Sequence, residues 1–91
     1  MTKELRRTSR FKKDYKREKK THSDLDDLLK PVLQLLMEGK TLPEKLKDHP
    51  LSGDWKDHRD CHIKPDLVLI YSADDDAVTV VRIGSHSELF G

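Results

Sequence analysis

The apolar residues of this sequence change their spacing partway along the chain, and that change restricts the fold to one class. In residues 23–39 they recur every three or four positions, which predicts an amphipathic helix. Beyond about residue 54 they alternate with polar residues, which predicts extended strands. The links between these strands are short, so neighbouring strands are expected to be antiparallel. The predicted strands span residues 55–63, 66–72 and 77–84.

The N-terminal part of the sequence predicts a short strand followed by a first helix. Residues 5–8 can form an edge strand, and residues 9–20 predict a helix with Ser9 at its N-cap. Phe11 and Tyr15 are four positions apart, so they share one face of this helix. That face can pack on a sheet while the basic side chains point outward.

The second helix is expected to begin near Ser23, whose hydroxyl can cap it, and to end at Gly39. Pro31 lies inside it, and because proline lacks a backbone N–H and clashes with the preceding turn, we expect the helix to kink or divide there. Residues 41–54 are expected to form a loop. Together these elements predict an α+β fold, with two N-terminal helices packed on one face of a small, mainly antiparallel, twisted sheet. Residues 1–91 are expected to form a single domain.

The composition limits the kinds of site that this chain can build. Apolar residues make up 34% of the sequence and charged residues 38%, so the core must be thin. A shallow, open site is expected in place of a deep pocket, and no cofactor is predicted. Cys61 is the single cysteine, which excludes an intrachain disulfide and suits a reducing compartment. No apolar stretch approaches the roughly 20 residues that cross a bilayer, so we expect a cytoplasmic protein that makes no membrane contact.

The charges are divided unevenly along the chain. Residues 1–20 contain ten Lys and Arg against three Asp and Glu, whereas the remaining residues are acidic overall and the net charge is +1. Such a basic segment can bind a polyanion, or it can be an ordinary solvated helix surface. The charge pattern alone leaves both interpretations open.

Titratable side chains gather in the predicted strands. The two-residue period of residues 55–63 places Asp60 and His62 on one face of the sheet, with His58 alongside. Asp66 opens the next strand directly after a tight turn, so it should lie near His62.

Residues near the C-terminus are expected to reach the same face. Val78, Val80 and Arg82 alternate along the last predicted strand, and continuing the alternation brings His86 to their side. His49 lies on the loop that enters the sheet, from which it can fold over this face. The candidate catalytic residues are His49, Asp60, His62, Asp66, Arg82 and His86.

This set of side chains contains every group that RNA cleavage without a metal requires. A base removes the proton of the ribose 2′-OH, a cation stabilises the charge on the phosphorane, and an acid protonates the leaving 5′-oxygen. Histidine suits the acid and the base because its unperturbed pKa is roughly 6.5, and the planar fork of arginine suits the phosphate. Charged residues on a small sheet are also common as plain solvent-facing positions, so spacing alone leaves this a hypothesis.

A zinc site is the competing interpretation of the histidines. His58 and His62 are four residues apart, which is a zinc-ligand spacing on a helix. On a strand the same spacing separates the two rings by roughly 13 Å. Because the chain also has a single cysteine, no metal site is predicted.

Three segments of the second half resemble the YafQ type of the RelE toxin family. They are His49-Pro50-Leu51-Ser52-Gly53-Asp54-Trp55-Lys56-Asp57-His58-Arg59-Asp60-Cys61-His62-Ile63, its continuation Lys64-Pro65-Asp66-Leu67-Val68-Leu69-Ile70-Tyr71, and the ending Arg82-Ile83-Gly84-Ser85-His86-Ser87-Glu88-Leu89-Phe90-Gly91. The resemblance is close from about Leu42 to the end. It is looser in the N-terminal half, where the basic helix and the leucine-rich helix match and Pro31 is a departure.

The resemblance implies a RelE-like fold and the toxin of a type II toxin–antitoxin system. Such a toxin is a ribosome-dependent mRNA endonuclease, or mRNA interferase, that cuts codons in the A site without a metal. The resemblance also implies a DinJ-like antitoxin that blocks the toxin, with the pair repressing its own operon by binding operator DNA. The implied active-site set is His49, Asp60, His62, Asp66 and His86, with Phe90 near the substrate.

Within this set, His86 is our candidate for the acid that protonates the leaving oxygen. The base stays open between Asp60, His62 and Asp66, and Arg82 is the candidate for phosphate stabilisation. The other predicted substrate contacts are aromatic side chains and lysines of the first helix, the latter toward ribosomal RNA phosphates. They are Phe90, Trp55, Lys12, Lys13, Lys16, Lys19 and Lys20, with Trp55 alternatively packed against the helices.

Two alternatives belong to other classes of activity. One is a ParE-like toxin that is not a nuclease and acts by binding a protein target, which would not need convergent histidines. The other is a ribonuclease that cuts free RNA. No role is assigned to His58, and Cys61, on the face opposite Asp60 and His62, is expected to be a small buried residue.

Overall fold

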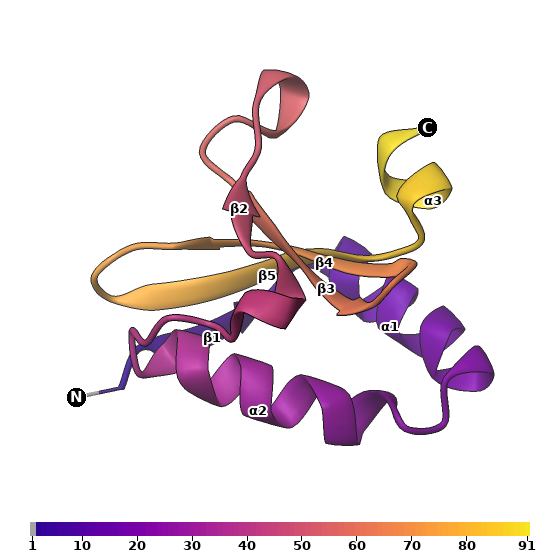
Figure 1. Cartoon of the computed structure of the whole chain (residues 1–91), viewed down its shortest axis with the longest axis horizontal. Coiled ribbons are helices and arrows are strands. Elements are labelled where there is room, and N and C mark those ends of the chain that lie inside the picture. The colour runs from indigo at the N-terminus through magenta and orange to yellow at the C-terminus, as the bar shows by residue number, and fades with distance from the viewer. Residues whose placement is uncertain (1) are drawn as a thin grey trace.

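The computed structural model describes residues 2–91 and confirms the predicted α+β architecture (Figure 1). A five-stranded sheet has the order β1-β5-β4-β3-β2, in which β1 pairs with β5 in parallel and the other pairs are antiparallel. The strands are β1 (Glu4–Arg7), β2 (His49–Pro50), β3 (Arg59–Lys64), β4 (Leu67–Ala73) and β5 (Ala77–Gly84). The helices are α1 (Ser9–Thr21), α2 (Leu25–Met37), α3 (His86–Phe90) and two 3₁₀ turns, Glu44–Leu46 and Gly53–Trp55.

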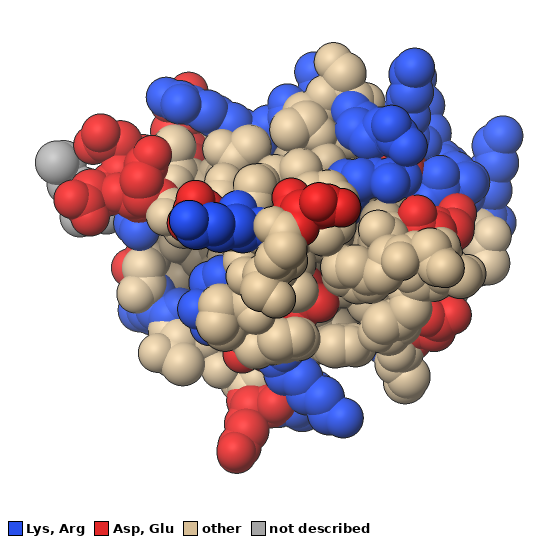
Figure 2. Space-filling view, turned by 90° about the horizontal axis from the view of Figure 1, so that it is seen from above, with Lys and Arg blue, Asp and Glu red and all other residues tan. Residues whose placement is uncertain are grey.

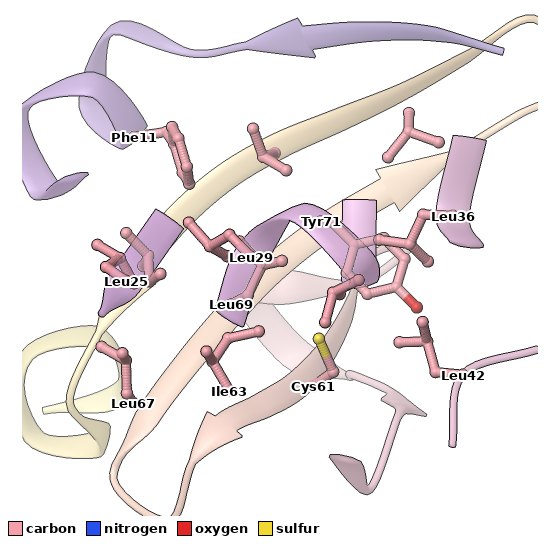
Figure 3. Close-up of a cluster of buried hydrophobic side chains, with 14 residues drawn as sticks. Phe11, Leu25, Leu29, Leu36, Leu42, Cys61, Ile63, Leu67, Leu69 and Tyr71 are labelled. Atoms are coloured by element: carbon pink, nitrogen blue, oxygen red, sulfur yellow. The ribbon is translucent and has the colours of Figure 1, made fainter. Parts of the chain in front are cut away.

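The main core lies between one face of the sheet and the helices α1 and α2, which both lie below the sheet in Figure 1. The side chains that fill it come from alternate strand positions, such as Leu67, Leu69 and Tyr71, and from the apolar stripes of the helices (Figure 3). Cys61 is fully buried there, which confirms its predicted position, and burial raises the pKa of its thiol to about 12. The alternate side chains of β3 and β4 are therefore directed to the opposite face.

That opposite face has a much smaller apolar cluster. Val68, Ile70 and Leu89 are buried together, and Trp55 is partly buried against them. The chain around β2 and the helix α3 both rise on this side of the sheet (Figure 1). Trp55 therefore packs on the face away from α1 and α2, so its predicted packing against those helices is wrong.

The helix boundaries correct three local predictions. The N-cap of α1 is Thr8, not Ser9, because the Thr8 hydroxyl accepts a hydrogen bond from Phe11 N at 3.0 Å. The second helix begins at Leu25 after Asp24 and has no side-chain cap, so the predicted cap at Ser23 is wrong. Pro31 does not divide α2. It is exposed, so it lies on the solvent-facing side of the helix.

The predicted strand over residues 55–63 begins only at Arg59. Trp55 ends a 3₁₀ turn, and Asp57 has φ 70°, which interrupts the extended backbone. His58 therefore does not lie in the strand beside Asp60 as predicted. Neither the short strand β2 nor the helix α3 was predicted, although the Ser85-x-x-Glu88 capping box that begins α3 is visible in the sequence.

A β-bulge in β5 overturns the predicted alternation in that strand. The register with β4 skips one residue between Val80 and Arg82, so Val80 and Ile83 enter the main core and Val81 joins the small cluster. The prediction that Val78, Val80 and Arg82 share a face is wrong for this reason. No helix within residues 2–91 is both long enough and apolar enough to cross a membrane.

Candidate active site

Two imidazole rings meet at a tilt on the open side of the sheet. His62 is on β3 and His86 begins α3, and their Nε2 atoms are 3.2 Å apart. The ring centroids are 5.2 Å apart. The tight turn between β3 and β4 and the capping box of α3 place these two residues, which are 24 positions apart in sequence. At this distance one ring can donate a hydrogen bond to the other.

Asp66 orients one ring of this pair. Its Oδ1 accepts hydrogen bonds from His86 Nδ1 at 2.7 Å and from the His86 backbone N–H at 3.0 Å. These bonds, the side-chain bond first, lower the pKa of Asp66, so the group is a carboxylate near neutral pH. A carboxylate only accepts hydrogen bonds, so the Nδ1 of His86 must hold a proton and its Nε2 is directed at His62.

His49 and Asp60 form a second pair next to the first. They lie directly opposite each other in the β2–β3 ladder, and His49 Nδ1 is 2.9 Å from Asp60 Oδ1. The same nitrogen is 2.9 Å from the carbonyl oxygen of Lys47, which has the better hydrogen-bond alignment. We therefore infer that His49 Nδ1 donates its hydrogen bond to Lys47 O, which leaves Asp60 Oδ1 without a hydrogen bond.

The site contains buried polar atoms that lack partners. Within residues 2–91, Asp60 Oδ1 and His62 Nδ1 are the buried side-chain atoms without a hydrogen bond. Burial raises the pKa of Asp60, and the nearby charges of His49, His62 and His86 lower it by less. Unpaired buried polar atoms are rare in native proteins and are often found where the structure serves a reaction.

The face around these side chains is open. Figure 2 looks onto this side of the sheet and shows acidic side chains near its centre and a large group of Lys and Arg side chains toward one end. Phe90 is exposed, and its ring lies 6.3 Å from that of His86 on the next turn of α3. The predicted convergence of His49, Asp60, His62, Asp66 and His86 on one face is confirmed, whereas their roles stay predictions.

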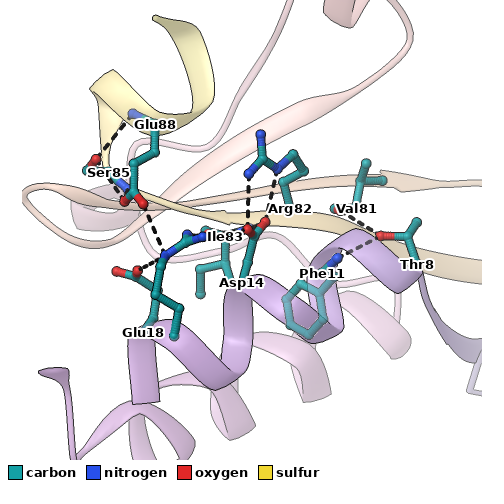
Figure 4. A network of polar contacts seen from close by, with 10 residues as sticks. Thr8, Phe11, Asp14, Glu18, Val81, Arg82, Ile83, Ser85 and Glu88 are labelled. Atoms are coloured by element: carbon teal, nitrogen blue, oxygen red, sulfur yellow. Dashed lines mark hydrogen bonds and ion pairs between the residues drawn. The ribbon is translucent and has the colours of Figure 1, made fainter. Parts of the chain in front are cut away.

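Arg82 is directed away from this cluster. Its Nε and Nη2 donate to the two carboxylate oxygens of Asp14 on α1, at 2.9 and 3.0 Å (Figure 4). Asp14 is 1% exposed. Burial alone would raise the pKa of Asp14, but the bonds from Arg82 and from the Ile83 backbone N–H outweigh it and lower the pKa. Two of the three guanidinium nitrogens are thus occupied, which counts against Arg82 as the main phosphate contact.

The predicted lysine contacts separate into two groups. Lys19 is bonded to Asp26 at 2.9 Å and to the carbonyl of Ser23, so it stabilises the α1–α2 turn. The other four remain exposed on α1 and free to meet a polyanion: Lys12, Lys13, Lys16 and Lys20. A groove of about 490 Å³ between α1 and α2 has Lys12 and Lys16 on its wall, but it is not at the histidines.

Sequence reasoning missed a basic groove that reaches His62. A hollow of about 390 Å³ beside His62 is lined by Lys45, Lys47 and Lys64, among others. The Nζ of Lys64 is bonded to Asp24 at 3.0 Å. Lys45 and Lys47 belong to the loop before β2, where their two-residue spacing was the available signal. The fold brings this loop against β3, so a phosphate chain that enters between His62 and His86 would find cations on one side.

Comparison with known proteins defines the class to which this chain belongs. Residues 3–91 match the family model described as the bacterial toxin of a type II toxin–antitoxin system, YafQ. The mRNA interferase toxin YafQ of Escherichia coli K12 is 39% identical over 84 residues, which cover 92% of this chain and 91% of the relative. The fold is thus that of a toxin from a type II toxin–antitoxin system.

Solved structures agree with this class. The E. coli DinJ–YafQ complex contains a chain that superimposes with a TM-score of 0.88 at 39% identity, covering 98% of this chain and 99% of that one. A metal-bound toxin from Helicobacter pylori superimposes with a TM-score of 0.88 at 43% identity, covering 99% of this chain and all of that one. The chain belongs to the YafQ family of toxins, which confirms the family predicted from the sequence. The E. coli relatives are named mRNA interferases, which are endoribonucleases, so the predicted enzyme class is confirmed.

Proposed function

We propose that this protein is an mRNA interferase that enters the ribosomal A site and cleaves the codon there through attack of a ribose 2′-OH. The chain Asp66–His86–His62 is the observation that supports this proposal most directly. It presents two imidazole nitrogens, one oriented by a carboxylate, on an open face that a phosphodiester can approach. A protein-binding toxin of the ParE-like kind would not need this arrangement.

In the proposed reaction His62 is the base and His86 the acid. His62 Nε2 takes the 2′-OH proton while the 2′-oxygen attacks phosphorus, and the bond from phosphorus to the 5′-oxygen breaks. His86 Nε2 gives its proton to that 5′-oxygen, so the products are a 2′,3′-cyclic phosphate and a 5′-hydroxyl. The direct contact between the two rings opens when the phosphodiester enters between them.

The surroundings of each group favour this assignment of the base and the acid. Asp66 holds the Nδ1 proton of His86 and stabilises the positive charge that the acid carries. Asp60 is 3% exposed, so its carboxyl is poorly placed to take a proton from bound RNA directly. His49 is exposed and lies beside Asp60, where its ring can donate to a phosphate oxygen. Phe90 and Trp55 remain proposed as surfaces on which bases stack.

The test is incubation of the purified protein with translating ribosomes, followed by mapping of the mRNA ends. We expect new 5′-hydroxyl ends within A-site codons, and little cleavage of the same transcript when it is free. Cutting of free RNA at equal rate would contradict the ribosome-dependent proposal. Because the H. pylori relative was crystallised with metal, transition metals are removed with a chelator that leaves ribosomal Mg²⁺ in place. Because the proposed chemistry uses no metal, cleavage must continue after the transition metals are removed.

The exposed lysines of α1 are expected to hold the toxin on ribosomal RNA. Reversing Lys12, Lys13, Lys16 and Lys20 to glutamate should weaken ribosome binding about tenfold or more at physiological salt. It should also flatten the dependence of affinity on salt, because fewer counterions are released. Binding is measured by sedimentation at several salt concentrations. Reversing Lys30 and Lys40, on and beyond α2, is the control for net charge and is compared with a reversal of two α1 lysines, Lys13 and Lys20. An equal loss in the two double variants would contradict a specific role for α1.

We also propose that a DinJ-like antitoxin neutralises the protein. The solved E. coli complex of DinJ with a relative that shares 39% identity supports this proposal. The toxin–antitoxin pair would then bind operator DNA and repress its own operon, with no DNA contact by the toxin alone.

A further inference from the structure

The position of α3 decides whether His86 faces His62. This helix has five residues, far fewer than a helix needs to be stable by itself in water. Leu89 anchors it on Val68 and Ile70, and the Asp66 bond holds its first residue. Leu89 fixes the depth of the helix and Asp66 holds its first residue, and a further contact at Glu88 adds a third point that defines the orientation of the helix.

Arg17 of α1 provides a contact from the other side of the sheet edge. Its Nε donates to Glu18 Oε2 on α1 at 2.8 Å and also lies 3.0 Å from Glu88 Oε2 on α3, where the two form an ion pair. Its Nη1 donates to Asp14 at 3.0 Å. Its Nη2 donates to the carbonyl oxygen of Ile83 at 3.3 Å. One guanidinium thus joins α1, the end of β5 and α3, and its planar fork restricts their relative orientation.

Glu88 is itself held in a fixed direction. Its Oε1 accepts from the Ser85 backbone N–H at 3.0 Å and from the Ser85 hydroxyl at 3.0 Å, while Oε2 meets Arg17 (Figure 4 shows Glu88 and Ser85 above Asp14). The capping box therefore fixes the carboxylate on the first turn of α3. The Ser85 backbone bond is the largest cause of the lowered pKa of Glu88, which keeps it charged opposite Arg17.

Gly84 allows this close approach. A Cβ at this position would lie 3.1 Å from Arg17 Nη2 and 3.3 Å from Glu88 Oε1. Any larger residue would push the two charged groups away from each other or from the strand. Gly84 therefore leaves space for the Arg17 guanidinium beneath α3.

From these contacts we propose that Arg17, acting through Glu88, is a positioning residue that sets the orientation of α3 and so the alignment of His86 with His62. The inference rests on the proposed cleavage by this pair. Arg17 and Glu88 are partly exposed, with side-chain exposures of 44% and 37%, so their ion pair contributes little to overall stability. Loss of this ion pair should instead lower the rate of cleavage, because a small displacement of a catalytic group greatly slows the reaction.

Arg17→Met is the first test, with kcat and KM measured for cleavage on ribosomes. We expect kcat to fall about ten- to a hundredfold and KM to stay within about twofold. The melting temperature should fall in Arg17→Met, because Arg17 also donates to buried Asp14, but should change little in Glu88→Gln, which removes only the exposed ion pair. Arg17→Lys should recover part of the rate, and Glu88→Gln should reproduce the loss. The double variant Arg17→Met with Glu88→Gln should lose no more than either alone, because both act through one contact. Arg10→Met, an exposed arginine on the same helix, is the matched control and should keep the wild-type values.

A second readout is independent of catalysis. The nuclear Overhauser contact between the His62 and His86 rings, whose centroids are 5.2 Å apart, should weaken in Arg17→Met and persist in Arg10→Met. An unchanged ring contact together with unchanged kcat would overturn the proposal. A rise in KM alone would also overturn it, since Arg17 would then be an RNA contact. If wild-type protein does not cleave but the ring contact still depends on Arg17, the proposed function fails while the positioning of α3 stands.

Discussion

Replacement of His86 by alanine is expected to lower the rate of RNA cleavage on the ribosome by about 10² to 10⁴. His86 is the group of the Asp66–His86–His62 chain whose Nδ1 is held by a carboxylate and whose Nε2 faces the open site. Without it the 5′-oxygen must leave as an alkoxide. The rate is measured in single-turnover cleavage, and expression of the alanine variant should no longer arrest growth.

Two comparisons separate acid catalysis from a structural effect. His86→Gln keeps a polar side chain of similar size but has no titratable proton, so it should be as slow as His86→Ala. An mRNA whose scissile 5′-oxygen is replaced by sulfur needs no acid, because a thiolate leaves readily, and it should restore much of the rate to both variants. His22→Ala, at the end of α1, is the control and should cleave normally. Normal cleavage by His86→Ala would remove the basis of the proposed mechanism.

The largest loss of stability is expected from Asp14→Ala. Asp14 is buried beneath the sheet edge and accepts four hydrogen bonds, from Arg82, Arg17 and the Ile83 backbone N–H. Removing it leaves the Arg82 guanidinium without its partner, which typically costs about 3–5 kcal/mol. The total free energy of unfolding of a small domain is only about 5–15 kcal/mol, so we expect a large decrease of the denaturation midpoint. Urea unfolding at neutral pH measures it.

The Arg82→Met change distinguishes an unpaired charge from lost packing. Combined with Asp14→Ala it should restore part of the stability, because it removes the buried charge that the first change leaves unpaired.

The contribution of Asp14 to the free energy of unfolding also depends on pH in a defined direction. The pKa of Asp14 is lowered in the folded protein, so its contribution is present above the unfolded pKa of about 3.9 and is lost as the pH falls through the folded value. At pH values below the folded pKa, the free energies of unfolding of the wild type and of Asp14→Asn should approach each other. A cost below about 1 kcal/mol for Asp14→Ala at neutral pH would contradict a stabilising role for the network.

The sequence predicted the secondary structure where local signals are strong. The leucine stripe of α2 and the short apolar segments that became β4 and β5 gave the α+β class, since their spacing and length separate a helix from strands. Predictions failed where one residue changes the backbone. Because Asp57 has a positive φ, β3 begins only at Arg59. The bulge at Val81 moves Arg82 off the face of the sheet to which simple alternation assigns it. Neither has a distinctive local pattern.

For the site, the sequence by itself determined which residue types were present and, through a two-residue period, that Asp60 and His62 share a face. It could not determine the contacts between segments. The 2.7 Å bond from Asp66 to His86 and the 3.2 Å approach of His86 to His62 depend on where the last five-residue helix packs. Only the tertiary structure decided that, because the position of a short helix is set by the distant side chains that it meets, here Leu89 against β4 and Glu88 against Arg17.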